Sequence, residues 1–290
     1  MAWTHDDLAF AHRLADAADA IALRHFASAG TAWRAKSDGS PVSLADEQIE
    51  RTLRSAIQRE HPADGVLGEE FGSTGRGRRR RWVVDAIDGT ASFLAGQPEW
   101  STLIALEADD TVVLGLVTAP ALGRRWWAAR GTGAWTQATG PAGSAPVQRV
   151  TITGADSLGD ADVGIWPPPA RLSPADRAVA ARLAAAARTT RPDADWTDTA
   201  RSPGPVLKPS TGTGTGTCHG ALLVATGQLD AFLLLGAGPW DIAALVPIIE
   251  EAGGAYAALT TAASTDTTAS ALFANPALQP QIIDVTNCGR

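Results

Sequence analysis

Four apolar segments between residues 82 and 134 constrain the fold of this chain more than any other feature. They are WVVDAI (82–87), STLIALEA (101–108), TVVLGLVTA (111–119) and RWWAAR (125–130), and glycine and proline residues occur between them. Segments of this length, rich in valine, isoleucine and tryptophan, are typical of β-strands that pair with their neighbours along the chain. We therefore predict an antiparallel meander over this region.

The first of these strands ends in two carboxylates, Asp85 and Asp88, and is followed at once by Gly89 and Thr90. A turn after the strand explains Asp88 and Gly89, but it does not explain an aspartate inside WVVDAI. Burying an unpaired carboxylate at Asp85 would be costly, so its position indicates a partner of opposite charge.

Helices and further strands are predicted on both sides of the meander. Residues 5–28 and 44–60 have apolar residues at helical spacing, the first with a capping pair of Thr4 and Asp7 and the second ended by Pro62. Beyond residue 146 the pattern predicts helices near 174–188 and 219–227, a strand at 229–235 and a helix that opens at Trp240 and Asp241.

The loop GPAGSAP (140–146) is the predicted domain boundary. It divides the chain into an N-terminal α+β domain, residues 1–145, with most of the acidic motifs, and a C-terminal α/β domain, residues 146–290, with Asp241 and the predicted specificity loops.

The overall composition excludes several classes of protein. A net charge of −7 over 290 residues argues against nucleic acid as a partner. Two cysteines, Cys218 and Cys288, cannot build a disulfide framework. The N-terminal segment carries acids where a signal peptide needs an apolar core, and no apolar run is long enough to span a membrane. We expect a cytoplasmic protein with no membrane partner.

Two segments have an unusual composition. The basic run Arg76–Arg81 is read as a solvated loop, with a nucleic-acid patch as the weaker alternative. Residues 189–217, which end in STGTGTGT, show no periodicity and are predicted to be a mobile loop of the kind that can close over a ligand.

Three more acidic signals resemble the Asp85 and Asp88 pair, because each lies at the end of an element next to glycine or serine. They are Glu69 and Glu70 in GVLGEEFG, Asp46 in SLADEQ and Asp241 in GPWDIAAL. Hard cations such as Mg²⁺ take oxygen ligands, and two such ions about 3.5–4 Å apart can activate a water and stabilise both oxygens of a phosphoryl transfer. Gly89 and Thr90 open a turn whose N–H groups suit phosphate oxygens.

Simpler readings exist for the same residues. Asp46 lies three positions after Ser43 and suits a capping box, and Asp241 suits an ordinary helix N-cap. Glu70 by itself reads as a solvated charge at a strand end. The D-x-x-D-G-T motif at residues 85–90 has no comparable structural explanation.

Taken together, these motifs resemble the inositol monophosphatase family, the lithium-sensitive Mg²⁺-dependent phosphatases. The resemblance covers most of residues 5–257. The segments that carry it, in the family's order and at similar separations, are KSDGSPVSLAD (36–46), GEE (68–70), DAIDGT (85–90), WDIAA (240–244) and EEAGG (250–254). The family implies a layered αβαβα sandwich, a homodimer and two to three Mg²⁺ ions per site.

The resemblance also implies roles for individual residues. The first metal would be held by Glu69, Asp85 and the carbonyl of Ile87. The second would be held by Asp85, Asp88 and Asp241, and Asp46 would bear on a third, weaker site through water. Glu69 and Thr90 would orient the attacking water, while Gly89 and Thr90 would offer N–H groups to the phosphate. The substrate-binding residues would then be Asp88, Gly89, Thr90, Asp241 and, with less support from the residues around it, His219.

Several positions depart from the family pattern. Ala86 replaces the usual proline of D-P-x-D and Ser92 replaces the asparagine of G-T-x-N-F, while Pro247 predicts a kink in the helix that Asp241 opens. Seven positions before Asp241 the inositol monophosphatases and histidinol phosphatases carry an acid that binds substrate hydroxyl or ammonium groups, whereas this chain has Leu234.

The resulting hypothesis is a phosphomonoesterase that acts on a small phosphorylated polyol, with inositol 1-phosphate as the family default. Phosphatases of histidinol phosphate, of 3′(2′)-phosphonucleotides or of a specialised sugar or nucleoside phosphate share the motifs and remain alternatives. A non-catalytic binding or regulatory protein with the same fold is the alternative from another class, and such a protein would be free to lose one of the acids.

Overall fold

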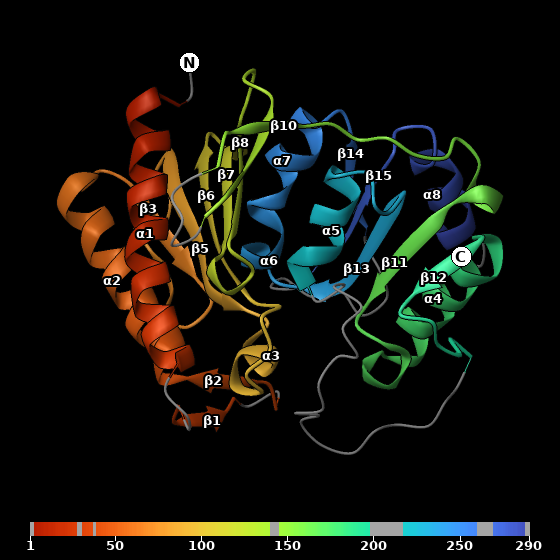
Figure 1. Ribbon diagram of the computed structural model, residues 1–290, viewed down its shortest axis with the longest axis horizontal. Helices are drawn as coiled ribbons and strands as arrows, with labels where there is room; N and C mark the ends of the chain where they lie inside the picture. The colour runs from red at the N-terminus through yellow and green to blue at the C-terminus, as the bar shows by residue number, and fades with distance from the viewer. Residues whose placement is uncertain are drawn as a thin grey trace. The chain divides into compact units, whose positions relative to one another are not determined.

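A computed structural model describes residues 3–27, 31–36, 39–139, 145–197, 217–259 and 269–287 (Figure 1). These residues separate into two compact units. Unit 1 contains the described residues up to Arg149 together with Ala243–Ile248, and unit 2 contains the other described residues. Among the described helices, none is long and apolar enough to cross a membrane.

Unit 1 is built on an eight-stranded sheet with the order β10-β9-β8-β7-β6-β5-β3-β4. Its strands are β3 (Gly65–Gly68), β4 (Gly72–Thr74), β5 (Arg80–Asp88), β6 (Ser101–Ala108), β7 (Thr111–Ala119), β8 (Arg124–Ala129), β9 (Ala134–Ala138) and β10 (Gln148–Val150). The pairs from β5 to β9 are all antiparallel, which confirms the predicted meander. β3 instead runs parallel to β5. A separate pair, β1 (Trp33–Ala35) and β2 (Pro41–Ser43), lies outside this sheet.

Two long helices cover this sheet, α1 (His5–Ala27) and α2 (Leu44–Glu60), as Figure 1 shows. They pack on each other and against β5, β6 and β7, and their apolar faces bury Leu14, Ile49 and Leu53 with Trp82 and Ile104 of the sheet. The capping pair predicted for α1 is present, since the Thr4 N–H donates to Asp7 Oδ2 at 2.7 Å and the Asp7 N–H donates to Thr4 Oγ1 at 3.2 Å. A short helix, α3 (Thr90–Leu94), and a 3-10 turn, η1 (Pro120–Leu122), complete the unit.

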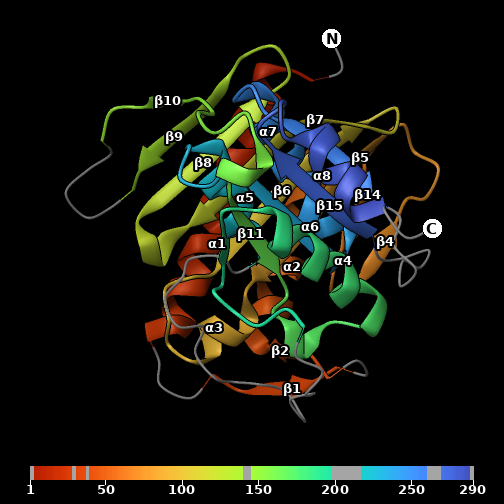
Figure 2. The ribbon, with the colours of Figure 1, turned by 90° about the vertical axis from the view of Figure 1, so that its right-hand side faces the viewer.

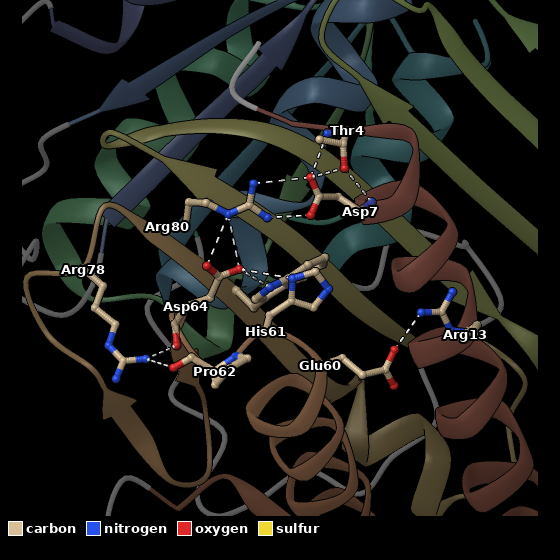
Figure 3. A network of polar contacts seen from close by, with 10 residues as sticks. Thr4, Asp7, Arg13, Glu60, His61, Pro62, Asp64, Arg78 and Arg80 are labelled. Carbon is tan, nitrogen blue, oxygen red and sulfur yellow. Dashed lines mark hydrogen bonds and ion pairs between the residues drawn. The ribbon is translucent and has the colours of Figure 1, made fainter.

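The basic run forms the predicted exposed loop only over residues 76–79. Its last two arginines, Arg80 and Arg81, begin β5. Arg80 Nη2 contacts Asp7 Oδ1 at 2.5 Å and its Nε donates to Asp64 at 3.3 Å (Figure 3). Arg79 pairs with Asp109, Arg81 pairs with Glu107, and Arg78 donates to two backbone carbonyls. These arginines tie α1, β5 and the loop before β3 together, and their charge is largely offset by acids.

Unit 2 is built on a five-stranded sheet with the order β12-β11-β13-β15-β14. Its strands are β11 (Asp162–Trp166), β12 (Thr189–Arg191), β13 (Ala231–Ala237), β14 (Ala255–Leu259) and β15 (Ala269–Ala274). β11 runs parallel to both β12 and β13, while β15 pairs antiparallel with β13 and β14. The described part of the chain is therefore an α+β fold that contains a parallel segment.

Helices cover both faces of this second sheet (Figure 2). α4 (Pro174–Ala186) and α8 (Gln279–Asn287) pack side by side over Ala231, Leu233 and Leu235. α5 (Thr217–Ala225) lies on the other face, because a Cβ at Gly220 would stand 2.2 Å from the ring of Phe232, and neighbouring residues of a strand point to opposite faces. Two 3-10 turns, η2 (Leu158–Asp160) and η3 (Pro169–Arg171), and two short helices, α6 (Pro239–Ala243) and α7 (Leu245–Glu251), complete the described elements; the first four residues of α7 belong to unit 1.

Two predicted elements of unit 2 differ from the structure. The segment 189–217 begins with strand β12, which is too short for its alternation to be visible in the sequence; residues 198–216 lie outside the described residues. The helix predicted from Asp241 onward consists of two short helices with Ala244 between them. Pro247 has no N–H to donate to the carbonyl of Ala243, so the helix is interrupted rather than merely kinked.

A polar network around the partly buried His12 joins α1 to β8. The guanidinium of Arg125 donates to Nδ1 of His12 at 3.4 Å and to Asp16 and Asp19 at 2.9 and 2.8 Å. The His12 ring also packs edge-on against Trp127 at 4.9 Å. Burial, reinforced by the charge of Arg125, lowers the pKa of His12 to about 4.

The depressed pKa predicts a loss of stability in acid that is specific to His12. Between pH 6.5 and about 4 the unfolded chain binds a proton at His12 that the folded chain does not, so stability falls as the pH falls through this window. Lowering the pH from 7.5 to 4.5 should reduce the unfolding free energy of the wild type by about 2 kcal/mol more than that of His12→Asn. Urea unfolding at both pH values measures the difference.

His5→Asn is the matched control, because His5 is an exposed histidine on the same helix. It should change the unfolding free energy by a similar small amount at both pH values. Equal acid sensitivity of wild type and His12→Asn would contradict the assignment.

Candidate functional site

The candidate site begins where β3 ends beside β5 in unit 1, four residues before β5 itself ends. The parallel register pairs Gly68 with Val84, so the next residues along the two strands are Glu69 and Asp85. Because the carboxyl ends of parallel strands meet at the same edge, the two acids occupy neighbouring positions there. Asp85 is 1% exposed and Asp88 is 3% exposed.

A β-bulge determines how Asp85 and Asp88 are oriented. Between the pairs Asp85–Leu103 and Asp88–Ser101, β5 advances three residues while β6 advances two. In a regular strand, residues three apart point to opposite faces of the sheet. One extra residue restores the parity and brings both carboxylates to the same face. Within the bulge the carbonyl of Ala86 accepts a hydrogen bond from Thr102 Oγ1 at 2.7 Å.

The turn after the bulge requires glycine. Gly89 has a φ of +86°, and a Cβ there would lie 2.9 Å from the carbonyl oxygen of Glu99. Its left-handed conformation caps α3 and places Thr90 at the first helical position. The Thr90 hydroxyl then has two acceptors within reach, the carbonyl oxygen of Ile87 at 3.0 Å and Asp46 Oδ1 at 3.2 Å.

Asp46 combines the capping role with a place in the site. Its Oδ2 accepts from the N–H and the Oγ of Ser43 at 2.8 and 2.5 Å, which completes the predicted capping box of α2. Its Oδ1 faces Thr90. Burial raises the pKa of Asp46 to about 6, against the hydrogen bonds from Ser43 and with a contribution from the charge of Glu69.

Lys36 stands between the two glutamates that follow β3. Its Nζ lies 2.7 Å from Glu69 Oε1 and 2.7 Å from Glu70 Oε1. Burial raises the pKa of Glu70 to about 7, with Lys36 opposing and the charges of Glu69 and Asp46 adding to the rise. Burial alone would lower the pKa of Lys36, but the two glutamates raise it above its usual value.

The chemistry of this donor set suits a hard divalent cation. The set offers only oxygen atoms: the carboxylates of Asp46, Glu69, Asp85 and Asp88 and the carbonyl oxygen of Ile87. Carboxylate and carbonyl oxygens are the ligands that such cations prefer. Asp46 and Glu70 have raised pKa values partly because neighbouring acids repel, and the single charge of Lys36 does not balance the cluster. The acidic cluster can therefore hold metal.

The other predicted site residues belong to unit 2. Asp241 is the third residue of α6 and therefore not the N-cap of the simpler reading; its Oδ2 instead reaches back to accept from the N–H of Gly238, which precedes the helix, at 2.7 Å. His219 lies in α5 and is 7% exposed, and burial lowers its pKa to about 4, so it is neutral at physiological pH. Leu234 lies within β13 and is 1% exposed.

The sequence prediction missed Lys36 as the counter-ion of Glu69 and Glu70, although Lys36 opened the segment that carried the family resemblance. It also missed Glu50, a buried acid of α2. One signal for Glu50 was present, because it lies four residues after Asp46 and hence on the same face of the helix.

An alanine substitution should destabilise the protein more at Gly89 than at Gly96, although both glycines have a left-handed backbone conformation. Gly96 has a φ of +71° and no atom within 4 Å of where a Cβ would lie, whereas a Cβ at Gly89 would meet the carbonyl of Glu99. Gly96→Ala should lower the free energy of unfolding by about 1 kcal/mol through backbone strain. Gly89→Ala should lower it by at least about 1 kcal/mol more, because of the added steric clash. Chemical unfolding of both variants measures the difference, and equal costs would contradict the close approach at Gly89.

The chain matches the family model described as "Inositol monophosphatase family" over residues 3–288. A histidinol-phosphatase of Mycobacterium tuberculosis is 34% identical over 286 residues, covering 99% of this chain and 100% of that protein. A histidinol-phosphatase of Chlorobaculum parvum is 33% identical over 250 residues, covering 86% of this chain and 84% of that protein.

Solved structures agree with these matches. The extragenic suppressor protein SuhB of Bartonella henselae has a TM-score of 0.78 at 20% identity, covering 98% of this chain and 100% of that chain, and confirms the predicted fold type. An inositol monophosphatase of Zymomonas mobilis has a TM-score of 0.74 at 26% identity, covering 97% of each chain. From its family model, its full-length relatives and its fold, the chain belongs to the inositol monophosphatase family and is a phosphoric monoester hydrolase.

Proposed function

We propose that this chain is a Mg²⁺-dependent phosphomonoesterase that hydrolyses a small phosphate ester. The observation that carries the proposal is the bulge of β5, which turns Asp85 and Asp88 to one face beside Glu69. Close to them the Thr90 hydroxyl is held by Asp46 and by the carbonyl of Ile87. A cluster of buried acids around a fixed hydroxyl suits metal-assisted phosphoryl transfer.

The proposed ligand set follows the family motif. Glu69, Asp85 and the Ile87 carbonyl would hold a first Mg²⁺, and Asp85, Asp88 and Asp241 would hold a second. Asp46 would bear on a third through water. When bound, such ions supply the charge that lowers the pKa of the attacking water and stabilises the phosphate oxygens.

The residues of the chain then position water and substrate. Thr90 and Glu69 would orient the attacking water, Glu69 as the acceptor of its proton. The backbone N–H groups of Gly89 and Thr90 would receive phosphate oxygens at the left-handed turn. Asp46 supports this arrangement because its Oδ1 accepts a hydrogen bond from the Thr90 hydroxyl and so fixes the orientation of the Thr90 side chain.

For the substrate we propose an amino-alcohol phosphate of the histidinol phosphate type. The support is that two relatives covered over most of their length bear the name histidinol-phosphatase. Inositol 1-phosphate is the second candidate, since the family is named for it. The side chain of Leu234 offers no acceptor for an ammonium or hydroxyl group, so other side chains would have to bind the leaving group. We propose the neutral His219 for this role.

Asp88→Asn tests the proposed metal role. It keeps the size of the side chain and removes a charge, so Mg²⁺-dependent hydrolysis of L-histidinol phosphate and inositol 1-phosphate should fall at least about a hundredfold while the circular dichroism spectrum is unchanged. Calorimetric Mg²⁺ binding should weaken in parallel. Chelation with EDTA should abolish the wild-type activity, and lithium should inhibit it.

Asp110→Asn is the matched control, since Asp110 is an exposed aspartate in the β6–β7 turn and should leave both measurements unchanged. Full activity of Asp88→Asn would contradict the metal role. A wild type that binds Mg²⁺ but hydrolyses no phosphate monoester in a broad panel would instead favour the non-catalytic binding protein.

Leu234 provides a test of how the leaving group is recognised. Leu234→Glu adds a carboxylate and should raise the ratio of activity on L-histidinol phosphate to activity on a nucleoside monophosphate, because an ammonium group gains a partner of opposite charge. Leu234→Gln adds hydrogen-bonding capacity without charge and should shift this ratio less. Both variants bury a polar group at a position 1% exposed, so thermal unfolding is measured first. An unchanged ratio in a folded Leu234→Glu variant would remove Leu234 from the specificity argument.

Family resemblance also supports a homodimer in solution. Light scattering of the purified chain at several concentrations tests it directly. A monomer at all concentrations would contradict this part of the proposal and leave the proposed chemistry unaffected.

A further inference from the structure

Glu50 is a fully buried carboxylate that the proposed chemistry does not use. It lies in α2, is 0% exposed and accepts two backbone hydrogen bonds, from the Glu70 N–H at 2.7 Å and from the Phe71 N–H at 3.2 Å. These two amides belong to the turn between β3 and β4, which also carries Glu69. A carboxylate of one helix therefore holds the backbone of the turn that presents a proposed metal ligand.

The approach of Glu50 to this turn leaves no room for a side chain at Gly68. A Cβ at residue 68 would lie 2.1 Å from Glu50 Oε1 and 2.4 Å from its carboxyl carbon. Gly68 lies in regular strand β3 and its φ is not positive, so glycine is needed there for space and not for conformation. The carboxylate is packed directly against the residue that precedes Glu69.

Arg54 balances the charge of Glu50 and contacts the same hairpin. Its Nε donates to Glu50 Oε1 at 2.7 Å, one helical turn further along α2. Its Nη2 contacts the Gly72 carbonyl and its Nη1 lies 3.4 Å from Thr74 Oγ1. Because Glu50 is fully buried, removing its partner Arg54 would leave a buried charge uncompensated.

We infer that Glu50 is a positioning residue for the metal site: by binding the Glu70 and Phe71 amides, it fixes the backbone on which Glu69 is presented beside Asp85. This inference rests on the proposed function. α2 then acts on the site at two points one turn apart, through Asp46, which accepts from Thr90, and through Glu50, which holds the turn after β3.

A purely structural role makes a different prediction. If Glu50 only stabilised the hairpin, its loss would lower the unfolding temperature and leave Mg²⁺ affinity unchanged in the folded fraction. If it positions Glu69, the affinity for Mg²⁺ and the turnover number must fall in a protein that is still folded. Outer-shell partners of metal ligands typically contribute about 10- to 100-fold in metal affinity or activity.

The first experiment compares Glu50→Gln with Glu60→Gln. Glutamine keeps the size of the side chain but presents an NH₂ group to one of the two amides that Glu50 accepts from. Glu60 is a matched control, because it lies on the same helix and its exposed carboxylate accepts from Arg13 (Figure 3) and from Arg59. Glu50→Gln should weaken calorimetric Mg²⁺ binding about 10-fold or more and lower kcat more than it changes KM, while Glu60→Gln should match the wild type.

The second experiment breaks the same contact from the other side. Gly68→Ala should weaken Mg²⁺ binding in the wild-type background, because the new methyl group displaces the Glu50 carboxylate. In a Glu50→Ala background the space is vacant, so Gly68→Ala should have little further effect. The two effects should therefore be strongly non-additive.

The outcomes separate the inference from the proposal on which it rests. Wild-type Mg²⁺ affinity in folded Glu50→Gln, or additive effects of Gly68→Ala and Glu50→Ala, would overturn the positioning role. If Glu50→Gln does not fold, the Mg²⁺ affinity of Gly68→Ala decides whether Glu50 has a positioning role, because this variant leaves every charge in place. A wild type that neither binds Mg²⁺ nor hydrolyses phosphate esters would overturn the proposed function instead.

Discussion

The one-residue bulge in β5 is the feature on which the rest of the site depends. Two aspartates three positions apart in a regular strand would face opposite sides of the sheet, and only one of them could reach a common ligand. Because β5 advances three residues where β6 advances two, Asp85 and Asp88 share a face. The left-handed Gly89 then redirects the chain at once, so that Thr90 lies over the bulge and its hydroxyl reaches the Ile87 carbonyl.

Concentrating this many acids in a partly buried site has an electrostatic cost, and the fold offsets it in two ways. Near the surface, Lys36 bridges Glu69 and Glu70. Inside the unit, Arg54 balances Glu50, which in turn binds the amides of the turn that follows β3. Burial raises the pKa values of Asp46 and Glu70, and repulsion from neighbouring acids adds to the rise. A divalent cation would relieve this repulsion, which is why the donor set fits one.

Much of the secondary structure was predictable, because the relevant signals are local. The capping pair of Thr4 and Asp7 and the capping box of Ser43 and Asp46 mark helix starts, and α2 has the predicted bounds. The predicted four-stranded meander is confirmed from β5 to β8, and the structure adds β9 to it. The predictions that were wrong concern context: Arg80 and Arg81 belong to a strand and are paired, and Thr189–Arg191 form an edge strand. The residues that pair with these two segments are distant in the sequence, so no local pattern predicts the pairing.

For the candidate site, the sequence by itself determined the set of candidate residues: the acids of D-x-x-D-G-T, G-E-E and W-D, whose oxygen atoms suit a hard cation. Only the tertiary structure decided how the acids of unit 1 are held. The parallel pairing of β3 with β5, the bulge between β5 and β6, and the hydrogen bonds from the Glu70 and Phe71 amides to Glu50 all join segments that are separated in the sequence. The physical reason is that side-chain direction depends on register and on burial against distant elements, and neither is encoded in the spacing of a motif.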